Sequence, residues 1–118
     1  NDPMWVELKA TGEFTKTEYF GRFLLKPFLT IKERADAVRL SELYYRGINE
    51  SAEQRTFLTV LAFLKFHVVE TDAKWWKDED GLNMLDEEPV YALYTLLQGV
   101  QNPKKEEKKD DDASQSNP

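Results

Sequence analysis

The most apolar stretch of the chain runs from Phe57 to Val69, where ten of thirteen residues are apolar and only Lys65 is charged. Its main apolar stripe has the spacing of a helix and consists of Phe57, Leu61, Leu64 and Val68, which Leu58, Val60, Ala62 and Phe63 widen. The preceding Ser51-Ala52-Glu53-Gln54 has the pattern of a capping box. We therefore predict a central helix over residues 52–70 that is covered on more than one side.

The first thirty residues show the alternation of a half-buried β-hairpin. Apolar or small residues predicted to face inward occupy every second position from residue 6, namely Val6, Leu8, Ala10, Gly12 and Phe14. After the polar residues 15–18, a second alternation sets Tyr19, Gly21, Phe23 and Leu25 against Phe20, Arg22, Leu24 and Lys26. Pro27 ends the predicted strand because it has no amide proton for the ladder.

The second predicted strand carries large apolar side chains on both of its faces. One face is expected to meet the helices, since a hairpin alone is only marginally stable. Phe20 and Leu24 lie on the other face, where two interpretations stay open: they pack in the core, or they meet another subunit.

Two further helices are predicted on either side of the central one. Thr30-Ile31-Lys32-Glu33 is a second capping box, and it opens a helix over residues 31–46 that stops at Gly47. The apolar positions of this amphipathic helix are Ile31, Ala35, Val38, Leu40, Leu43 and Tyr44. Acidic residues before Pro89 predict a last helix over residues 87–98, after a long structured loop over residues 70–85.

These elements predict an α+β fold in which an N-terminal antiparallel hairpin packs on about three helices. We expect residues 4–101 to form a single domain. Residues 103–118 contain no large apolar side chain, and four lysines there nearly balance five acidic residues, so residues 102–118 are predicted to be a disordered charged tail. Residues 1–3 resemble a cloning remnant, which places the expected natural start at Met4.

Composition narrows the classes of function. The chain has no cysteine, which excludes disulfides, thiol catalysis and thiolate metal sites, and makes the cytoplasm the default location. No apolar run approaches the roughly 20 residues of a membrane span. A net charge of −6 opposes general nucleic-acid binding. We therefore expect a protein partner, with no nucleic acid and no membrane.

Candidate residues for chemistry are few. His67 is the only histidine and lies in the most apolar segment, without a serine or aspartate at the spacing of a nucleophilic set, so it is interpreted as a structural residue. The acids of residues 76–81 resemble half of a calcium loop but lack the glutamate in register, which excludes calcium binding there. We predict no catalytic, cofactor or metal site, and hence no enzyme.

Trp75 and Trp76 are the remaining candidates, because adjacent residues cannot both face one core. Either both indoles pack locally, or one of them is an exposed anchor for a partner. The chain has more large apolar side chains than about 100 ordered residues are expected to bury. We therefore expect self-association or a helical partner, with Phe20, Leu24 and one of Trp75 or Trp76 at the contact.

The order of these elements resembles a known group of proteins. A short hairpin, the transition Leu24-Leu25-Lys26-Pro27-Phe28-Leu29-Thr30-Ile31-Lys32-Glu33, an apolar second helix and the segment from Val68-Val69-Glu70 to Trp75-Trp76-Lys77 are similar to small tailed-bacteriophage proteins of the tail assembly chaperone type, over residues 4–101. The resemblance implies a non-catalytic protein of the host cytoplasm that binds aggregation-prone helices of the tape measure protein and is absent from the mature tail. The alternative is a structural virion component, a connector or decoration subunit.

Overall fold

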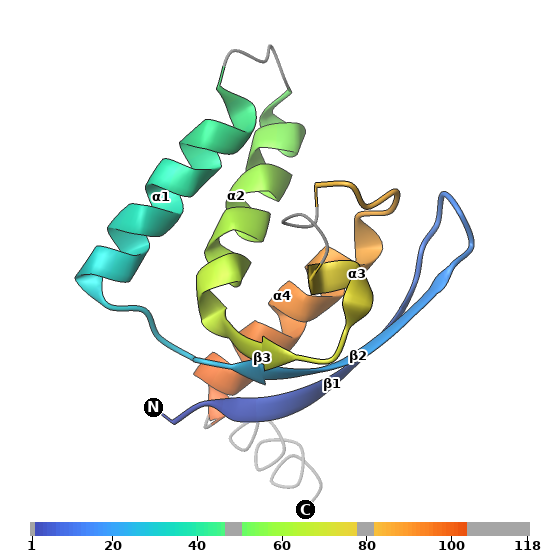
Figure 1. The fold of residues 1–118 in the computed structure, drawn as a ribbon, viewed down its shortest axis with the longest axis horizontal. Helices are drawn as coiled ribbons and strands as arrows, with labels where there is room; N and C mark the ends of the chain where they lie inside the picture. The colour runs from blue at the N-terminus through green and yellow to red at the C-terminus, as the bar shows by residue number, and fades with distance from the viewer. Residues whose placement is uncertain (1, 47–50, 78–81, 104–118) are drawn as a thin grey trace, which may run out of the picture.

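The structure is a computed structural model that describes residues 2–46, 51–77 and 82–103. The elements in chain order are β1 (Met4–Thr11), β2 (Glu18–Leu25), α1 (Ile31–Tyr45), α2 (Ala52–His67), β3 (Val68–Thr71), α3 (Lys74–Lys77) and α4 (Glu88–Gln101). The helices all lie on one side of an antiparallel sheet (Figure 1). The predicted α+β fold is therefore confirmed.

The hairpin of β1 and β2 forms as predicted. Its register runs without a shift from Met4 opposite Leu25 to Thr11 opposite Glu18. In the turn the Gly12 N–H donates to the Thr17 carbonyl at 2.7 Å, and Lys16 has a left-handed backbone with φ 63°. This continuous ladder gives the sheet its two long strands.

A third strand replaces the end of the predicted central helix. The helix was expected to reach residue 70, but α2 ends at His67, and β3 then pairs antiparallel with β2. Val68 and Val69 are β-branched residues that favour a strand, and β2 offers them a partner. The sheet order is β1-β2-β3.

The predicted caps of the first two helices are present. The Thr30 hydroxyl accepts from the Glu33 N–H, the Ser51 hydroxyl accepts from the Gln54 N–H, and both boxes are reciprocal. The last helix runs to Gln101 rather than residue 98, and the Gln101 side chain donates to the Pro27 carbonyl at 2.9 Å. The region predicted as a loop over residues 70–85 contains the end of β3 and the short helix α3.

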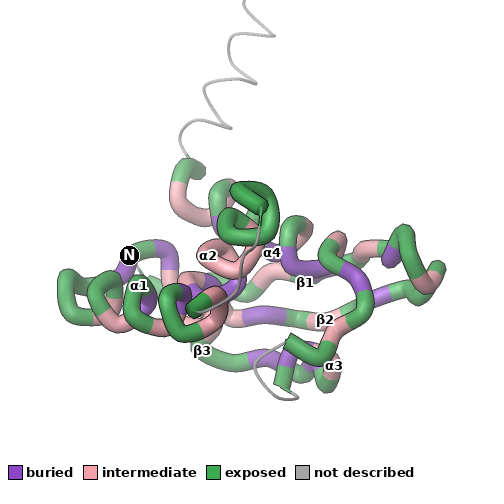
Figure 2. The backbone as a smooth tube through the Cα atoms, turned by 90° about the horizontal axis from the view of Figure 1, so that it is seen from above, coloured by how far each residue is buried: buried purple, intermediate pink, exposed green. Residues whose placement is uncertain are grey.

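A single core lies between the sheet and the helices α2, α3 and α4. Its buried members are Leu8, Tyr19, Phe23, Leu25, Leu61, Leu64, Ala73, Trp76, Val90, Leu93 and Leu97. None of these residues belongs to α1, which packs against α2 at the side of the molecule (Figure 1). Figure 2 shows the same division, with buried segments along the strands and a largely exposed α1.

Some predictions fail or fall outside the described part. Phe14 was expected to face inward, but β1 ends at Thr11 and Phe14 is exposed in the turn. Gly47, the predicted end of the first helix, lies outside the described residues, as does the predicted tail from residue 104 onward. Only Asp2 and Pro3 of the expected cloning remnant are described.

Candidate protein-interaction surface

The helix α1 exposes three of its larger apolar side chains, Ile31, Val38 and Leu43. Its fully buried residues are the small Ala37 and Ser41, which lie one turn apart and face α2. Ile31, Ala35 and Val38 recur at intervals of four and three residues on an exposed face that lies roughly 100° around the helix axis from Ala37 and Ser41. The predicted apolar positions therefore divide between two faces: Leu40 and Tyr44 are half-buried, and Tyr44 packs against the core, whereas Ile31, Ala35 and Val38 are exposed.

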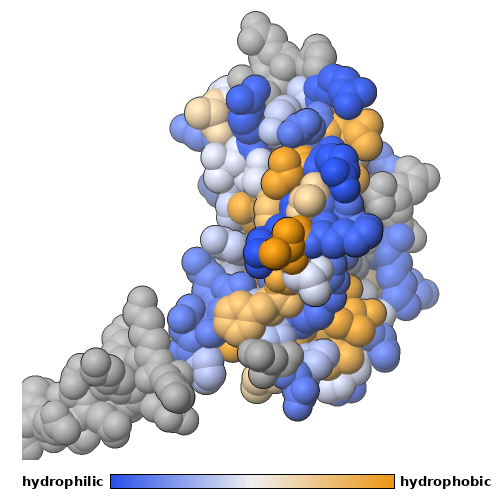
Figure 3. Space-filling model, turned by 90° about the vertical axis from the view of Figure 1, so that its left-hand side faces the viewer, coloured by the Kyte–Doolittle hydropathy of each residue, from blue (hydrophilic) through white to orange (hydrophobic). Residues whose placement is uncertain are grey.

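We call Ile31, Ala35 and Val38 the α1 stripe. Ile31 is 78% exposed and Val38 is 44% exposed, and the exposed side chains of Phe28 and Leu43 lie before and after the stripe in the sequence. Figure 3, viewed from the side on which α1 lies, shows hydrophobic side chains gathered in a column between hydrophilic ones. Contiguous exposed apolar surface of this kind marks interaction sites in soluble proteins.

The charges beside the α1 stripe are mainly basic. Lys32 and Arg39 are exposed on one flank, and both form ion pairs with the single carboxylate of Asp36, Lys32 at 2.9 Å. These pairs, first that with Lys32, hold the pKa of Asp36 below its ordinary value. Arg34 is exposed on the other flank. Glu42 is exposed four residues after Val38, so Lys32, Arg34 and Arg39 against Asp36 and Glu42 leave a small excess of positive charge beside the stripe, in a chain of net charge −6.

The N-terminus of α1 is fixed by polar contacts. The Lys26 ammonium pairs with the Glu33 carboxylate, and the Arg34 guanidinium donates to the Leu29 carbonyl at 2.9 Å. The hydrogen bond from Lys26, followed by that from the Thr30 backbone, lowers the pKa of Glu33 to about 2. These contacts set the direction of α1 without covering its outward face.

Phe20 and Leu24, two of the predicted contact residues, lie on the outer face of the sheet. Phe20 is 54% exposed and Leu24 is half-buried. Leu24 lies opposite Trp5, and the Arg22 guanidinium stacks 4.6 Å from the Trp5 ring centroid. The outer face is thus a second accessible surface, in which aromatic and charged side chains alternate.

Trp75 and Trp76, one of which was predicted to contact a partner, both pack within the fold. The half-buried Trp75 lies edge-on to Tyr19 at 5.6 Å between centroids, and its indole N–H donates to the Phe20 carbonyl at 2.9 Å. Trp76 is only 6% exposed and packs edge-on against Phe23 at 6.0 Å. The structure therefore favours local packing over an exposed indole at this position.

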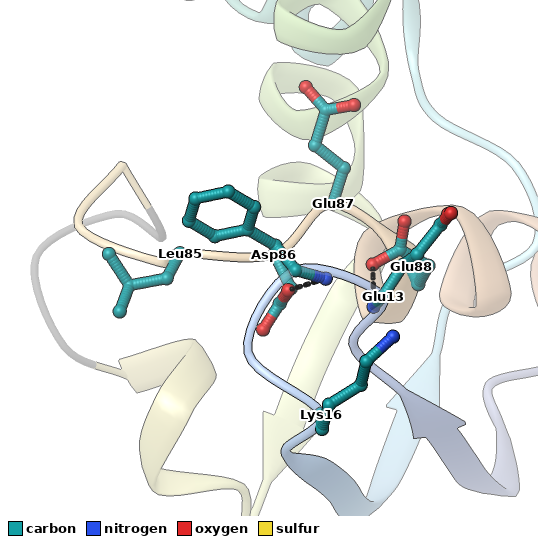
Figure 4. A pocket seen from close by; sticks show the side chains of 7 residues that line it. Glu13, Lys16, Leu85, Asp86, Glu87 and Glu88 are labelled. Atoms are coloured by element: carbon teal, nitrogen blue, oxygen red, sulfur yellow. Dashed lines mark hydrogen bonds between the residues drawn. The ribbon is translucent and has the colours of Figure 1, made fainter.

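An open cleft of about 750 Å³ lies where the hairpin turn meets the start of α4 (Figure 4). Acidic residues dominate its lining, and the Glu88 carboxylate accepts from the Glu13 N–H at 2.9 Å. Lys16 is the one cation among its lining residues. Two of these acids have structural partners, since the carboxylates of Asp86 and Glu88 both accept from backbone N–H groups of the hairpin turn.

Asp86 is the buried carboxylate at the base of this cleft. It accepts from the N–H groups of Phe14 at 2.9 Å and Thr15 at 3.0 Å, from the Thr15 hydroxyl, and from the Tyr19 hydroxyl at 2.7 Å. Burial raises the pKa of Asp86, but these donors outweigh burial and hold the pKa below its ordinary value. The ionised carboxylate therefore holds the hairpin turn in place.

His67 is a buried structural residue in the described fold. Its Nδ1 lies 2.6 Å from the Lys26 carbonyl, and burial lowers the pKa of the imidazole. It lines a groove of about 300 Å³ between α2 and α4 together with Phe63, Tyr94 and Leu97. No carboxylate is among the residues that line this groove, and the Thr59 hydroxyl there donates to the Arg55 carbonyl at 2.9 Å.

The described residues contain neither a metal-binding cluster nor a membrane-spanning helix. Among residues 2–46, 51–77 and 82–103, no group of three or more His, Cys, Asp or Glu side chains could hold a metal ion. None of the helices in the same ranges is long and apolar enough to cross a membrane.

Comparison with known proteins gives no relative. The chain matches no family model, no curated protein and no solved structure.

Sequence reasoning missed two features of this surface. The sequence does contain a signal for the orientation of α1. Ala37, Ser41 and Tyr44 follow helical spacing and share one face, and small residues on such a face permit close approach of another helix. Asp86 was grouped with its acidic neighbours, and no local pattern distinguishes it from Glu87, because its partners lie about 70 residues away.

Proposed function

We propose that this chain is a non-enzymatic protein-binding module that covers an apolar helix of a partner protein with the outward face of α1. The observation that carries the proposal is the α1 stripe, an exposed apolar face on a helix whose other side already packs on α2. A second helix laid along this face would bury the stripe by ordinary helix packing.

The charges beside the α1 stripe indicate which kind of partner helix would bind there. Lys32, Arg34 and Arg39 are exposed beside the stripe, and Asp36 is already shared between Lys32 and Arg39. An amphipathic helix with acidic residues on both sides of its apolar face would complement these cations. A helix with basic flanks would meet repulsion.

The resemblance to tail assembly chaperones supplies a biological form of this proposal. In that form the partner is an aggregation-prone helix of a phage tape measure protein, and the chain acts in the host cytoplasm during tail assembly. Exposed apolar surface on α1 supports such a role, because a chaperone must present apolar surface to its client.

A peptide titration tests the proposed surface. The probe is a labelled synthetic helix with a leucine stripe and glutamate flanks, and a matched peptide with lysine flanks is its control. Fluorescence anisotropy should show binding of the acidic peptide. The variant Ile31→Ser with Val38→Ser should weaken this binding about tenfold or more, since each apolar contact is worth roughly 1 kcal/mol or more.

The matched control for the protein is Phe20→Ser with Leu24→Ser on the outer face of the sheet. This variant should bind the acidic peptide as the wild type does. No binding by the wild type, equal binding of the two peptides, or equal loss in both double variants would contradict the assignment of the α1 stripe.

The second candidate function is a structural virion component. The exposed Phe20 and half-buried Leu24 on the outer sheet face favour it, since a subunit fixed in a particle uses more than one surface. Mass spectrometry of purified particles separates the two functions. Stoichiometric presence of the chain in the particles would contradict the chaperone function, and its absence would contradict the structural function.

A further inference from the structure

The outward backbone groups of β2 and of β1, on the two sides of the hairpin, differ in their hydrogen bonding. Beyond β3, which is only four residues long, side chains satisfy the outward backbone of β2. The Arg22 N–H donates to Asp72 at 2.9 Å, the Thr71 hydroxyl donates to the Arg22 carbonyl at 2.7 Å, and Trp75 donates to the Phe20 carbonyl at 2.9 Å. Hydrogen bonds therefore close the part of β2 that β3 does not pair with.

The opposite edge, formed by β1, is open. In an antiparallel pair, residues alternate between those whose N–H and C=O both face the partner strand and those whose groups face away. Gly12 donates to Thr17 across the hairpin, so even-numbered residues of β1 face β2. The backbone groups of the odd-numbered residues point outward, and these residues are Trp5, Glu7, Lys9 and Thr11.

In the part of the chain that the structure describes, these outward groups make no hydrogen bond to another element. In the described ranges β1 pairs with β2 alone, and no hydrogen bond from another element reaches the backbone of the four odd-numbered residues. All four side chains are exposed. The register of β1 has no bulge, and the strand contains no proline, so nothing in it interrupts further pairing.

We propose that the edge of β1 pairs antiparallel with β1 of a second copy of this chain. The charges select one register. With Leu8 opposite Leu8 of the copy, each Glu7 lies opposite Lys9 of the other chain, and each Trp5 lies opposite Thr11. All four outward residues of each strand then take part in the new ladder.

The neighbouring registers are unfavourable. A shift in one direction sets Glu7 against Glu7 of the copy on the two-fold axis, and a shift in the other direction sets Lys9 against Lys9. Like charges directly opposite each other destabilise a strand pair. Charged residues on an edge often prevent association, but here their order makes the edge complementary to itself.

Sedimentation equilibrium of the full chain at low ionic strength tests the pairing. The wild type should form a dimer. Glu7→Lys or Lys9→Glu alone sets two like-charged pairs across the interface and should weaken self-association about tenfold or more. An equimolar mixture of the two variants restores both opposite-charge pairs and should recover the wild-type affinity as a heterodimer.

A backbone variant tests the same edge without charge reversal. Lys9→Pro removes an outward N–H but no bond of the β1–β2 ladder, so it should abolish the dimer while circular dichroism keeps the wild-type spectrum. Lys9→Ala is its control for the lost side chain and should retain more association than Lys9→Pro.

Several outcomes would overturn the pairing. These are a monomeric wild type, a dimer unaffected by the single reversals or by Lys9→Pro, and a mixture that associates no better than its components. The readout is independent of the peptide titration at the α1 stripe, so either surface can fail alone.

Discussion

The hairpin turn and the first helix lie at two sides of the molecule and are held in opposite ways. At the turn, the single Asp86 carboxylate accepts from two backbone N–H groups and two hydroxyls. The helix α1 supplies only the half-buried Tyr44 to the margin of the core, and its buried residues are Ala37 and Ser41. The turn is fixed by buried polar bonds, whereas α1 is fixed by its N-terminal capping box and its packing against α2.

This difference separates stability from binding. A buried ionised group with all its donors in place contributes strongly, and its removal leaves those donors without partners. A face that is already in water contributes little to folding, so its apolar residues are available for a partner. We expect substitutions at the turn to change the melting temperature and substitutions at the α1 stripe to change binding.

The largest effect is predicted for Asp86→Ala. This substitution removes the acceptor of the Phe14 and Thr15 N–H groups and of the Tyr19 hydroxyl. We expect the melting temperature to fall by about 10 °C or more, measured by circular dichroism. Glu87→Ala, at the exposed neighbouring position, is the control. An equal fall in its melting temperature would contradict the role of Asp86 in holding the turn.

Gly12→Ala should have the next largest effect. A Cβ at Gly12 would lie 2.2 Å from the Cγ of Asp86, so the turn or the carboxylate must move. We expect a fall of about 5 °C. Because both residues act on the same contact, the double variant with Asp86→Ala should lose much less than the sum of the two single losses. Additive losses would show that Gly12 acts elsewhere.

The same comparison shows how far sequence reasoning reaches. The capping boxes at Thr30 and Ser51 and the alternation of the hairpin are local signals, and the structure contains all of them. The contact between Asp86 and Thr15 joins residues 71 positions apart, and its geometry depends on how α4 docks. No local pattern contains that information.

The α1 stripe was missed for another physical reason. Apolar periodicity identifies which residues of a helix share a face, but not which face meets the core. In α1 the small Ala37 allows close approach to α2, and the larger Ile31 remains outside. For β3 the pairing partner determines the secondary structure. Val68 and Val69 continue the apolar pattern of the helix, but they belong to a strand because β3 pairs with β2.

Acid should weaken the N-terminus of α1 by a smaller amount. The pKa of Glu33 is about 2 against an ordinary value of 4.5, so the folded state binds this proton more weakly than the unfolded state. The contribution is therefore complete above pH 4.5 and is lost as the pH falls through 2. The melting temperatures of the wild type and Glu33→Gln should converge between about pH 5 and about pH 2.

The partner cation provides the check on that prediction. Lys26→Met removes the ion pair with Glu33 and should show the same convergence with the wild type. A constant difference across this range would mean that the pair does not set the acid response of α1.

The smallest effect on stability is predicted for the α1 stripe itself. Ile31 and Val38 are exposed, and serine has a helix propensity close to theirs, so Ile31→Ser with Val38→Ser removes little that folding uses. We expect the melting temperature to change by less than about 3 °C. The matched control is Ala37→Val on the buried face of the same helix, where Ala37 is 0% exposed. The added methyl groups have no room against α2, so this variant should melt several degrees lower, by about 5 °C. A stripe variant that melts as low as Ala37→Val would mean that the outward face of α1 is part of the fold rather than a surface for a partner.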